Sequence, residues 1–222
     1  MKLIANERGF TLIELLVASL VTMLILGGAV MLTNQVQASF TRQIEDAAAE
    51  QEGRYALEWV SRLIRGAGNN PYSLPAVVGG KAECPAANTD YSWLVIDPNL
   101  DTVNNDIRIQ TDSNPPDGIL GGTAGDCTQP NEDVTVSYNA ASRSITFLDN
   151  NLGGAASIRT DAVIEGLNFI YRDASHNVTA NAANVMYVET QVTVRTRLVD
   201  SLTGLPATRL LTQEVRMRGR NY

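Results

Sequence analysis

The dominant pattern in this chain is an uninterrupted apolar run close to its N-terminus. Residues 10–32 read FTLIELLVASLVTMLILGGAVML and contain a single ionisable side chain, Glu14. At about 1.5 Å of rise per residue, a helix of this segment is about 35 Å long, which is enough to cross the hydrocarbon core of a bilayer. The pattern therefore predicts that residues 10–32 form the membrane-spanning first half of a helix.

Beyond residue 32 the pattern changes from uniformly apolar to amphipathic. Mostly apolar side chains recur at steps of three and four, which is the spacing of one helix face. They are Val36, Phe40, Ile44, Ala47, Gln51, Tyr55, Trp59 and Leu63. Because no proline occurs before Pro71, we predict that residues 33–66 continue the same helix and pack this face, with its aromatic rings, on the chain's own domain. Gly53 is an expected weak point, and a coiled-coil stem is the alternative.

The rest of the chain has the pattern of β-structure. Residues 71–130 are rich in Pro, Gly, Asn and Asp, and short strands are expected there at 92–97 and 106–110. From residue 133 onward alternating segments predict strands at 134–138, 144–148, 162–172, 186–199 and 208–218. The predicted fold class is α+β, with the long N-terminal helix packed on one C-terminal antiparallel sheet within residues 67–222.

Charge limits the partners that this chain can bind. The net charge of −7 argues against a general nucleic-acid surface, because affinity for phosphates comes from Lys and Arg. Positive charge nevertheless gathers near the C-terminus, and two paired edge strands could place it in one basic stripe. Its members are Arg195, Arg197, Arg209, Arg216, Arg218 and Arg220. Solvated charge that protects edge strands is the favoured interpretation. A contact with an acidic neighbouring subunit and DNA binding are the alternatives.

Flanking charges indicate the topology and the redox environment. Lys2 and Arg8 precede the apolar run, whereas the first charge after it is Arg42. The positive-inside rule then places the N-terminus in the cytoplasm and the remaining chain outside it. The two cysteines, Cys84 and Cys127, would lie in an oxidising compartment, so a disulfide is expected, with two free buried thiols as the alternative.

Residues 97–106 have the composition of a calcium loop. The twelve-residue calcium pattern nevertheless fails at its sixth position, Thr102, where the turn requires glycine, and at its twelfth, Arg108, where glutamate is needed. Solvated turn residues are therefore the favoured interpretation, and no cofactor is expected. A less regular calcium site is the alternative, with ligands drawn from Asp97, Asp101, Asp106 and Asp112.

Motifs that carry catalysis are missing from the sequence. There is no P-loop, no glycine fingerprint for a dinucleotide and no HExxH pattern. The single histidine, His176, cannot build a zinc site with the two cysteines, and it lies in a turn-like segment. The chain is therefore not expected to be an enzyme.

Glu14 is the unusual residue of the apolar run. A carboxylate at mid-bilayer costs about 2.5–3.5 kcal/mol by insertion scales, so it requires a partner. Neither Lys nor Arg lies within a helical turn on its membrane side. Cleavage between Gly9 and Phe10 would create a positive α-amino group about 6 Å along the helix axis from Glu14. That amine could then pair with the carboxylate of a neighbouring copy.

The segment 9–18, GFTLIELLVA, resembles the class III leader junction of type IV pilins and of type II secretion pseudopilins. The resemblance implies a leader peptide of residues 1–9, which prepilin peptidase removes after Gly9. It also implies N-methylation of Phe10, and a role for Glu14 in engaging the Phe10 amine of an adjacent subunit. The overall plan is similar to that of PilW-like minor pilins and J-type pseudopilins.

The resemblance implies a minor pilin-like structural subunit for assembly or initiation of a type IV pilus. A pseudopilin of a type II secretion system and a filament-carried receptor for DNA uptake or adhesion are the alternatives. The implied partners are prepilin peptidase, major and minor pilins, the inner-membrane assembly platform and, before assembly, the membrane. The chain would cross the inner membrane once, with a periplasmic domain, and then enter a surface pilus. Outside this family, the alternatives are a cleaved secretory signal peptide ending at Ala38 and an uncleaved anchor on an unrelated domain.

Overall fold

The computed structural model describes residues 10–69, 93–112, 130–199 and 204–218. The chain divides into two compact units, residues 1–44 and 45–222, and each is described by itself. In chain order the elements are α1 (Leu12–Gly66), β1 (Leu94–Ile96), β2 (Asp106–Gln110), β3 (Asp133–Asn139), β4 (Ser144–Asp149), β5 (Ser157–Ile158), β6 (Ile164–Arg172), η1 (Ala182–Asn184), β7 (Tyr187–Val199) and β8 (Pro206–Arg216).

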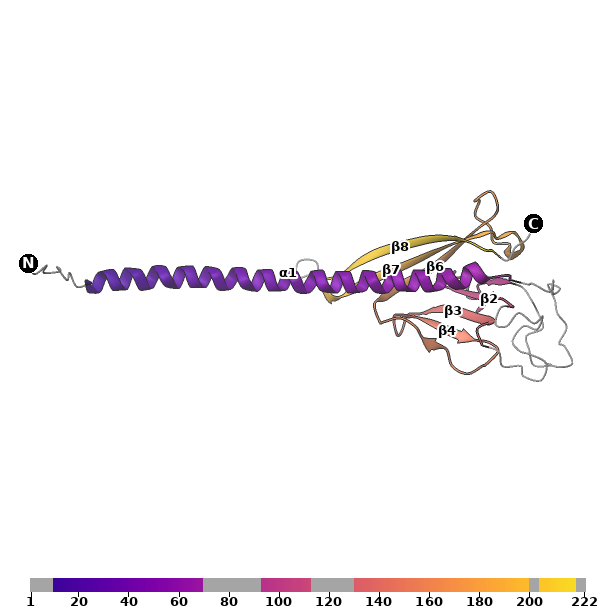
Figure 1. Ribbon diagram of the computed structural model, residues 1–222, viewed down its shortest axis with the longest axis horizontal. Coiled ribbons are helices and arrows are strands. Elements are labelled where there is room, and N and C mark those ends of the chain that lie inside the picture. Colours follow the sequence, from indigo (N-terminus) through magenta and orange to yellow (C-terminus); the bar gives the residue numbers. More distant parts are fainter. Residues whose placement is uncertain (1–9, 70–92, 113–129, 200–203, 219–222) are drawn as a thin grey trace, which may run out of the picture. The chain divides into compact units, whose positions relative to one another are not determined.

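The first unit consists of the apolar part of α1. The predicted continuous helix is confirmed, because α1 runs without a break from Leu12 to Gly66 (Figure 1). Within this unit every described residue, from Phe10 to Ile44, is exposed. An apolar helix surface of this length requires burial by lipid or by other protein chains.

The described strands of the second unit form two antiparallel sheets, so the expectation of one sheet was wrong. One sheet has the order β1-β2-β3-β4-β5 and the other the order β6-β7-β8. The first sheet ends at β5, which is only two residues long and had no detectable sequence pattern. The two sheets are joined by backbone contacts, including the N–H of Phe169 in β6, which donates to the carbonyl of Asn104 at 2.8 Å.

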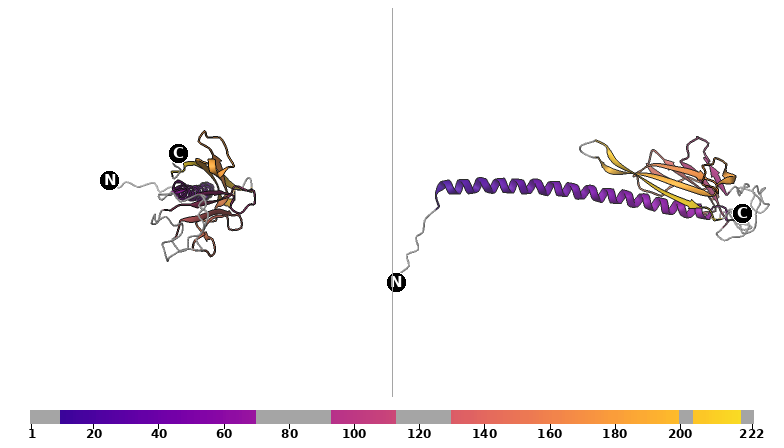
Figure 2. Two further views of the ribbon diagram at one scale, coloured as in Figure 1. Left: turned by 90° about the vertical axis from the view of Figure 1, so that its right-hand side faces the viewer. Right: turned by 90° about the horizontal axis from the view of Figure 1, so that it is seen from above.

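The second part of α1 packs between these sheets, as Figures 1 and 2 show. On one side the ring of Trp59 lies 5.8 Å from the ring of Phe147 in β4. On another side the backbone of Gly53 approaches Val194 of β7 and Leu211 of β8. The predicted fold class, a long helix packed against C-terminal antiparallel β-structure, is therefore confirmed.

The helix face that packs on the sheets differs from the predicted one. Tyr55 is 51% exposed, Ala47 and Gln51 are also exposed, and Trp59 is only partly buried. The buried positions are instead Ala49, Gly53, Ala56, Leu57, Val60, Ser61 and Ile64. Small residues dominate the first half of this face because β7 and β8 lie close to the helix backbone, where a large side chain would not fit.

A buried acid organises the polar contacts at one end of the central strand of the first sheet. Asp133, at the start of β3, is fully buried and receives hydrogen bonds from three side chains. Arg108 donates from Nε and Nη2 at 2.8 and 2.6 Å, and Gln110 donates at 3.0 Å. Asn150 donates from Nδ2 at 2.8 Å. This network offsets the cost of burying a carboxylate.

Replacing Asp133 with alanine is expected to lower the free energy of unfolding by about 3–5 kcal/mol, because the Arg108 guanidinium loses its buried partner. Asp161→Ala is the matched control. Its ion pair with Arg197 is exposed on both sides, so its loss should cost about 0.5 kcal/mol or less. Urea denaturation of the full chain in detergent measures both variants, and equal small losses would contradict the structural role of Asp133.

Candidate assembly site

The N-terminus of α1 is closed by reciprocal hydrogen bonds between Thr11 and Glu14. The backbone N–H and the Oγ1 hydroxyl of Thr11 donate to Glu14 Oε2 at 2.9 and 3.0 Å. In return, the N–H of Glu14 donates to Thr11 Oγ1 at 3.3 Å. Thr11 is therefore the N-cap and Glu14 the third helical residue of a capping box.

The capping box gives Glu14 a function within its own chain. It satisfies backbone donors of the first helical turn, and it places negative charge at the positive end of the helix dipole. It also holds the Glu14 carboxylate beside Thr11, which directly follows Phe10. A carboxylate oxygen accepts more than one hydrogen bond, so Glu14 retains capacity for a further donor. Thr11 was not predicted as a site residue, although a Thr followed three residues later by a Glu is the sequence signal of such a cap.

The apolar surface beside this cap is extensive. α1 contains a segment that is long and apolar enough to cross a membrane, and no residue in that segment is buried. Signal sequences pass the same test of length and composition, so this property alone does not identify the segment as a membrane span. Phe10, the proposed mature N-terminus, is 86% exposed.

Several predicted site residues lie outside the described residues. These are Gly9, at the expected cleavage site, both members of the expected disulfide, Cys84 and Cys127, and Arg220. Cleavage after Gly9 and the disulfide therefore stay predictions.

The described arginines near the C-terminus do not form one basic stripe. Antiparallel pairing places Arg195 of β7 opposite Thr208, whereas Arg216 of β8 lies opposite Tyr187. Arg195 and the partner position of Arg216, Tyr187, are eight residues apart along β7, which corresponds to about 26 Å. Three of the side chains also pair with acids of the same chain: Arg195 with Glu165 at 3.3 Å, Arg197 with Asp161 at 3.1 Å and Arg209 with Glu50 at 2.5 Å.

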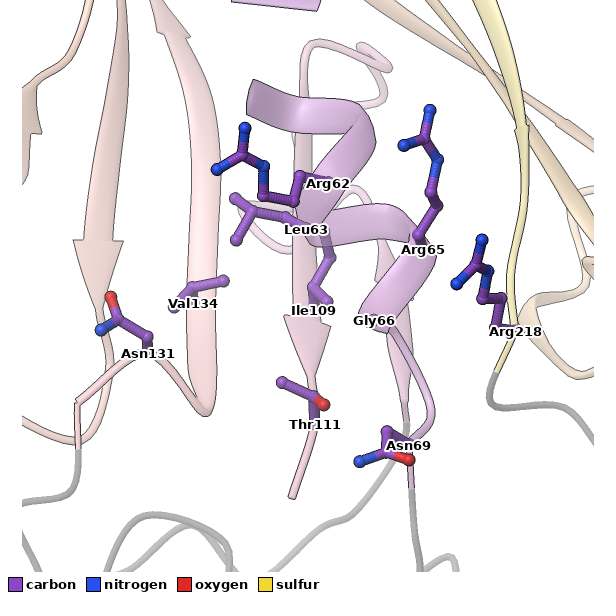
Figure 3. A pocket seen from close by; sticks show the side chains of 10 residues that line it. All are labelled: Arg62, Leu63, Arg65, Gly66, Asn69, Ile109, Thr111, Asn131, Val134 and Arg218. Atoms are coloured by element: carbon purple, nitrogen blue, oxygen red, sulfur yellow. The ribbon is translucent and has the colours of Figure 1, made fainter. Parts of the chain in front are cut away.

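Arg218 instead lies beside the C-terminal end of α1, at a pocket of about 620 Å³ (Figure 3). Its backbone N–H donates to the carbonyl of Arg65 at 3.3 Å. Arg62, Leu63, Arg65, Gly66, Asn69, Ile109, Thr111, Asn131, Val134 and Arg218 line the pocket. These described lining residues include no Asp, Glu, His or Cys, so they offer no general base that could activate the Thr111 hydroxyl.

Three of the acids considered for calcium lie in one loop. Asp97, Asp101 and Asp106 precede or begin β2, whereas Asp112 lies beyond its other end, where its N–H donates to the carbonyl of Asn69 at 2.9 Å. Within the described ranges, no three His, Cys, Asp or Glu side chains are already gathered in a metal-binding arrangement. Burial raises the pKa of Asp106 to about 6, and the charges of Asp97 and Asp101 add to this increase.

The raised pKa of Asp106 predicts a pH-dependent stability. Folding favours the protonated acid, so its contribution to stability is greatest below pH 4 and is lost as the pH rises through about 6. In metal-free buffer, Asp106→Asn should therefore gain stability over the native chain as the pH rises from 4 to 7. Thermal unfolding of the full chains in detergent at four pH values measures this difference. A difference that does not change with pH would contradict the expected titration.

Comparison with known families supports the assignment of the N-terminal segment. A family profile described as the prokaryotic N-terminal methylation motif matches residues 4–30. No curated protein and no solved structure matched the chain. The matched segment includes the capping box and the first part of the exposed apolar helix.

The matched motif lies at the start of a long helix that precedes β-sheets. The chain carries a prepilin-type N-terminal methylation motif on a pilin-like helix with C-terminal β-sheets, as in type IV pilins and pseudopilins. The motif implies processing by prepilin peptidase, and the apolar helix suggests membrane anchoring before assembly. Type IV pilins and pseudopilins, which share these features, are structural proteins and typically not enzymes.

Proposed function

We propose that the chain is a minor pilin-like subunit that assists assembly or initiation of a type IV pilus. The observation that carries this proposal is the methylation motif across the start of a helix whose apolar surface is fully exposed. An apolar surface of this size is unfavourable in water. A filament subunit buries it first in lipid and, after leaving the membrane, against the helices of other subunits.

The mechanism begins with cleavage after Gly9, which creates a free amine on Phe10 for methylation. In the membrane, the cost of the Glu14 carboxylate is reduced by the two hydrogen bonds from Thr11. During assembly, the carboxylate binds the positive amine of an adjacent subunit. A buried charge without a partner is strongly destabilising, so this pair sets the axial register between subunits.

The capping box prepares Glu14 for pairing with the neighbouring amine. Because Thr11 fixes the rotamer of Glu14, less side-chain entropy is lost when the carboxylate meets the neighbouring amine. Cleavage between Gly9 and Phe10 leaves Thr11 and Glu14 unchanged. The same cap is therefore expected in the precursor and in the mature subunit.

The proposed partners and location follow from this mechanism. Prepilin peptidase acts first, and the assembly platform of the inner membrane and other major and minor pilins act afterwards. The precursor is anchored in the inner membrane with its C-terminal domain in the periplasm, and the mature subunit lies in a surface pilus. A disulfide between Cys84 and Cys127 would form in that compartment.

The same motif also fits a pseudopilin of a type II secretion system, which is the second candidate. Deletion of the gene, with complementation by the native chain, distinguishes the candidates. Loss of surface filaments, counted by electron microscopy, supports the pilus function. Intact filaments with lost protein export support the pseudopilin. Intact filaments and export, with lost DNA uptake or adhesion, would support a carried receptor instead.

A further inference from the structure

The loop between β1 and β2 has the residue spacing and the side-chain-to-backbone hydrogen bonds of a calcium loop. Asp97, Asn99 and Asp101 occupy every second position, which is the spacing of the first three side-chain ligands in such loops. The two carboxylate oxygens of Asp97 accept the N–H groups of Asp101 and Thr102 at 3.1 and 2.8 Å. Asp101 Oδ1 accepts the N–H of Val103 at 2.8 Å. The backbone is thus folded around these side chains, and each oxygen retains a second lone pair for a cation.

The folded chain accommodates both residues that depart from the calcium pattern. Thr102 occupies the sixth position and has a φ of 68°, so it adopts the left-handed conformation for which glycine is normally required. Arg108, at the twelfth position, lies within β2 and pairs with Asp133 at 2.6 Å. It is therefore held in the sheet by its own ion pair.

Asp106 supplies the observation that points to a ligand. Its side chain is only 2% exposed, and its Oδ1 atom has no hydrogen-bond partner among the described residues. The carboxylate lies close to the loop, because the charges of Asp97 and Asp101 and the backbone of Asn99 all influence its pKa. A buried carboxylate oxygen without a donor is costly, and a bound cation would remove that cost.

We propose that this loop binds one calcium ion through Asp97, Asn99, Asp101 and Asp106, with carbonyl oxygens and water completing the six to eight ligands that calcium prefers. Asp106 takes the place of the missing glutamate. The acids of the described chain do not yet converge at metal-binding distance, so calcium draws their side chains together. We therefore expect the modest affinity of extracellular calcium modules, with a Kd of about 10⁻⁴ to 10⁻³ M.

The position of the loop gives calcium a structural effect. The carbonyl of Asn104 accepts the N–H of Phe169 in β6 at 2.8 Å, and that of Asn105 accepts the N–H of Tyr138 in β3 at 3.1 Å. The loop thus contacts both sheets. Calcium would stabilise the junction between them, whether the chain serves in a pilus or in a secretion system.

Titration of the full chain in detergent, after treatment with a chelator, tests the proposal. Calorimetry should give saturable binding of one calcium ion, whereas magnesium, which demands octahedral geometry, should bind at least about tenfold more weakly. At a calcium concentration of 100 times the Kd, the Tm should rise by about 5 °C. No saturable binding up to about 10 mM, or equal binding of magnesium, would overturn the proposal.

Three variants locate the site. Asp97→Asn and Asp106→Asn should each weaken calcium binding at least about tenfold, since each removes a charged ligand. Asp173→Asn is the matched control, because Asp173 Oδ1 accepts N–H groups of Ser175 and Asn177 at 2.8 and 2.9 Å in a different turn. It should leave the calcium response unchanged. Asp106→Asn should keep the Tm of the chelated native chain or raise it, which separates lost binding from misfolding.

If Asp106→Asn does not fold, Asp101→Asn at the exposed side of the loop replaces it. Calcium binding that survives both the Asp97 and the Asp101 substitutions would show that the ion binds elsewhere and would overturn the assignment.

Discussion

Replacing Glu14 with alanine is expected to leave membrane insertion and leader cleavage intact and to reduce incorporation into filaments about tenfold or more. The variant removes the carboxylate that would pair with the Phe10 amine of a neighbour, and loss of a buried charge partner costs several kcal/mol. Insertion should not suffer, because alanine is less costly than an acid in a membrane. Quantitative blotting of sheared filaments against membrane fractions measures incorporation, and normal incorporation would contradict the register function.

Two further variants separate the charge of Glu14 from its helix cap. Glu14→Gln keeps a capping-box residue but removes the charge, whereas Thr11→Ala removes the cap and keeps the charge. The pairing mechanism predicts that Glu14→Gln assembles as poorly as Glu14→Ala and that Thr11→Ala has the smaller defect. The reverse order would assign the function of Glu14 to capping.

Replacing Gly53 with valine is expected to lower the free energy of unfolding by about 3 kcal/mol, although valine is the better helix former. A Cβ atom at this position would lie 2.6 Å from Leu211 Cδ1 and 2.6 Å from Val194 Cγ1. The sheet formed by β7 and β8 would have to move away from α1. Denaturation of the full chain in detergent measures the loss.

Gly66→Val is the matched control for this overpacking, because it is the last residue of the same helix and has open space around its Cβ position. Its stability should change by about 0.5 kcal/mol or less. A Gly53→Val chain as stable as the native one would contradict the close approach of helix and sheet.

The secondary structure of this chain was largely predictable because its signals are local. The apolar run, the absence of proline before Pro71 and the Gly- and Asn-rich residues 66–70 predicted both ends of α1. The segment 106–110 was predicted with the observed bounds, and the strands β3, β4, β6, β7 and β8 differed by one to two residues at their ends. Alternating residues and turn residues are enough to predict such strands.

The arrangement of these elements was less predictable because it depends on contacts between distant residues. The core face of α1 contains Ala49, Gly53 and Ala56, and nothing in the helix itself indicates that a sheet approaches there. The separation of Arg195 from Arg216 follows from the pairing of β7 with β8. Division of the strands into two sheets likewise depends on pairing, which hydrophobic alternation does not encode.

The candidate assembly site was predictable in part. Gly9, Phe10 and Glu14 follow from a short sequence motif, whereas the capping function of Thr11 required attention to the three-residue spacing before Glu14. For the proposed calcium loop, the sequence pattern was too strict. The sequence excluded a regular loop because Thr102 is not glycine, yet the folded backbone holds Thr102 at a φ of 68°.

Mass spectrometry of the N-terminus of the protein purified from its native cells tests the central claim most directly. The proposed processing predicts a chain that begins at Phe10 and carries one methyl group on its α-amine. A chain that begins at Met1 would lack the amine on which the pairing with Glu14 depends, and one that begins at Ser39 would lack the apolar helix. Either result would contradict the assignment of this chain as a filament subunit.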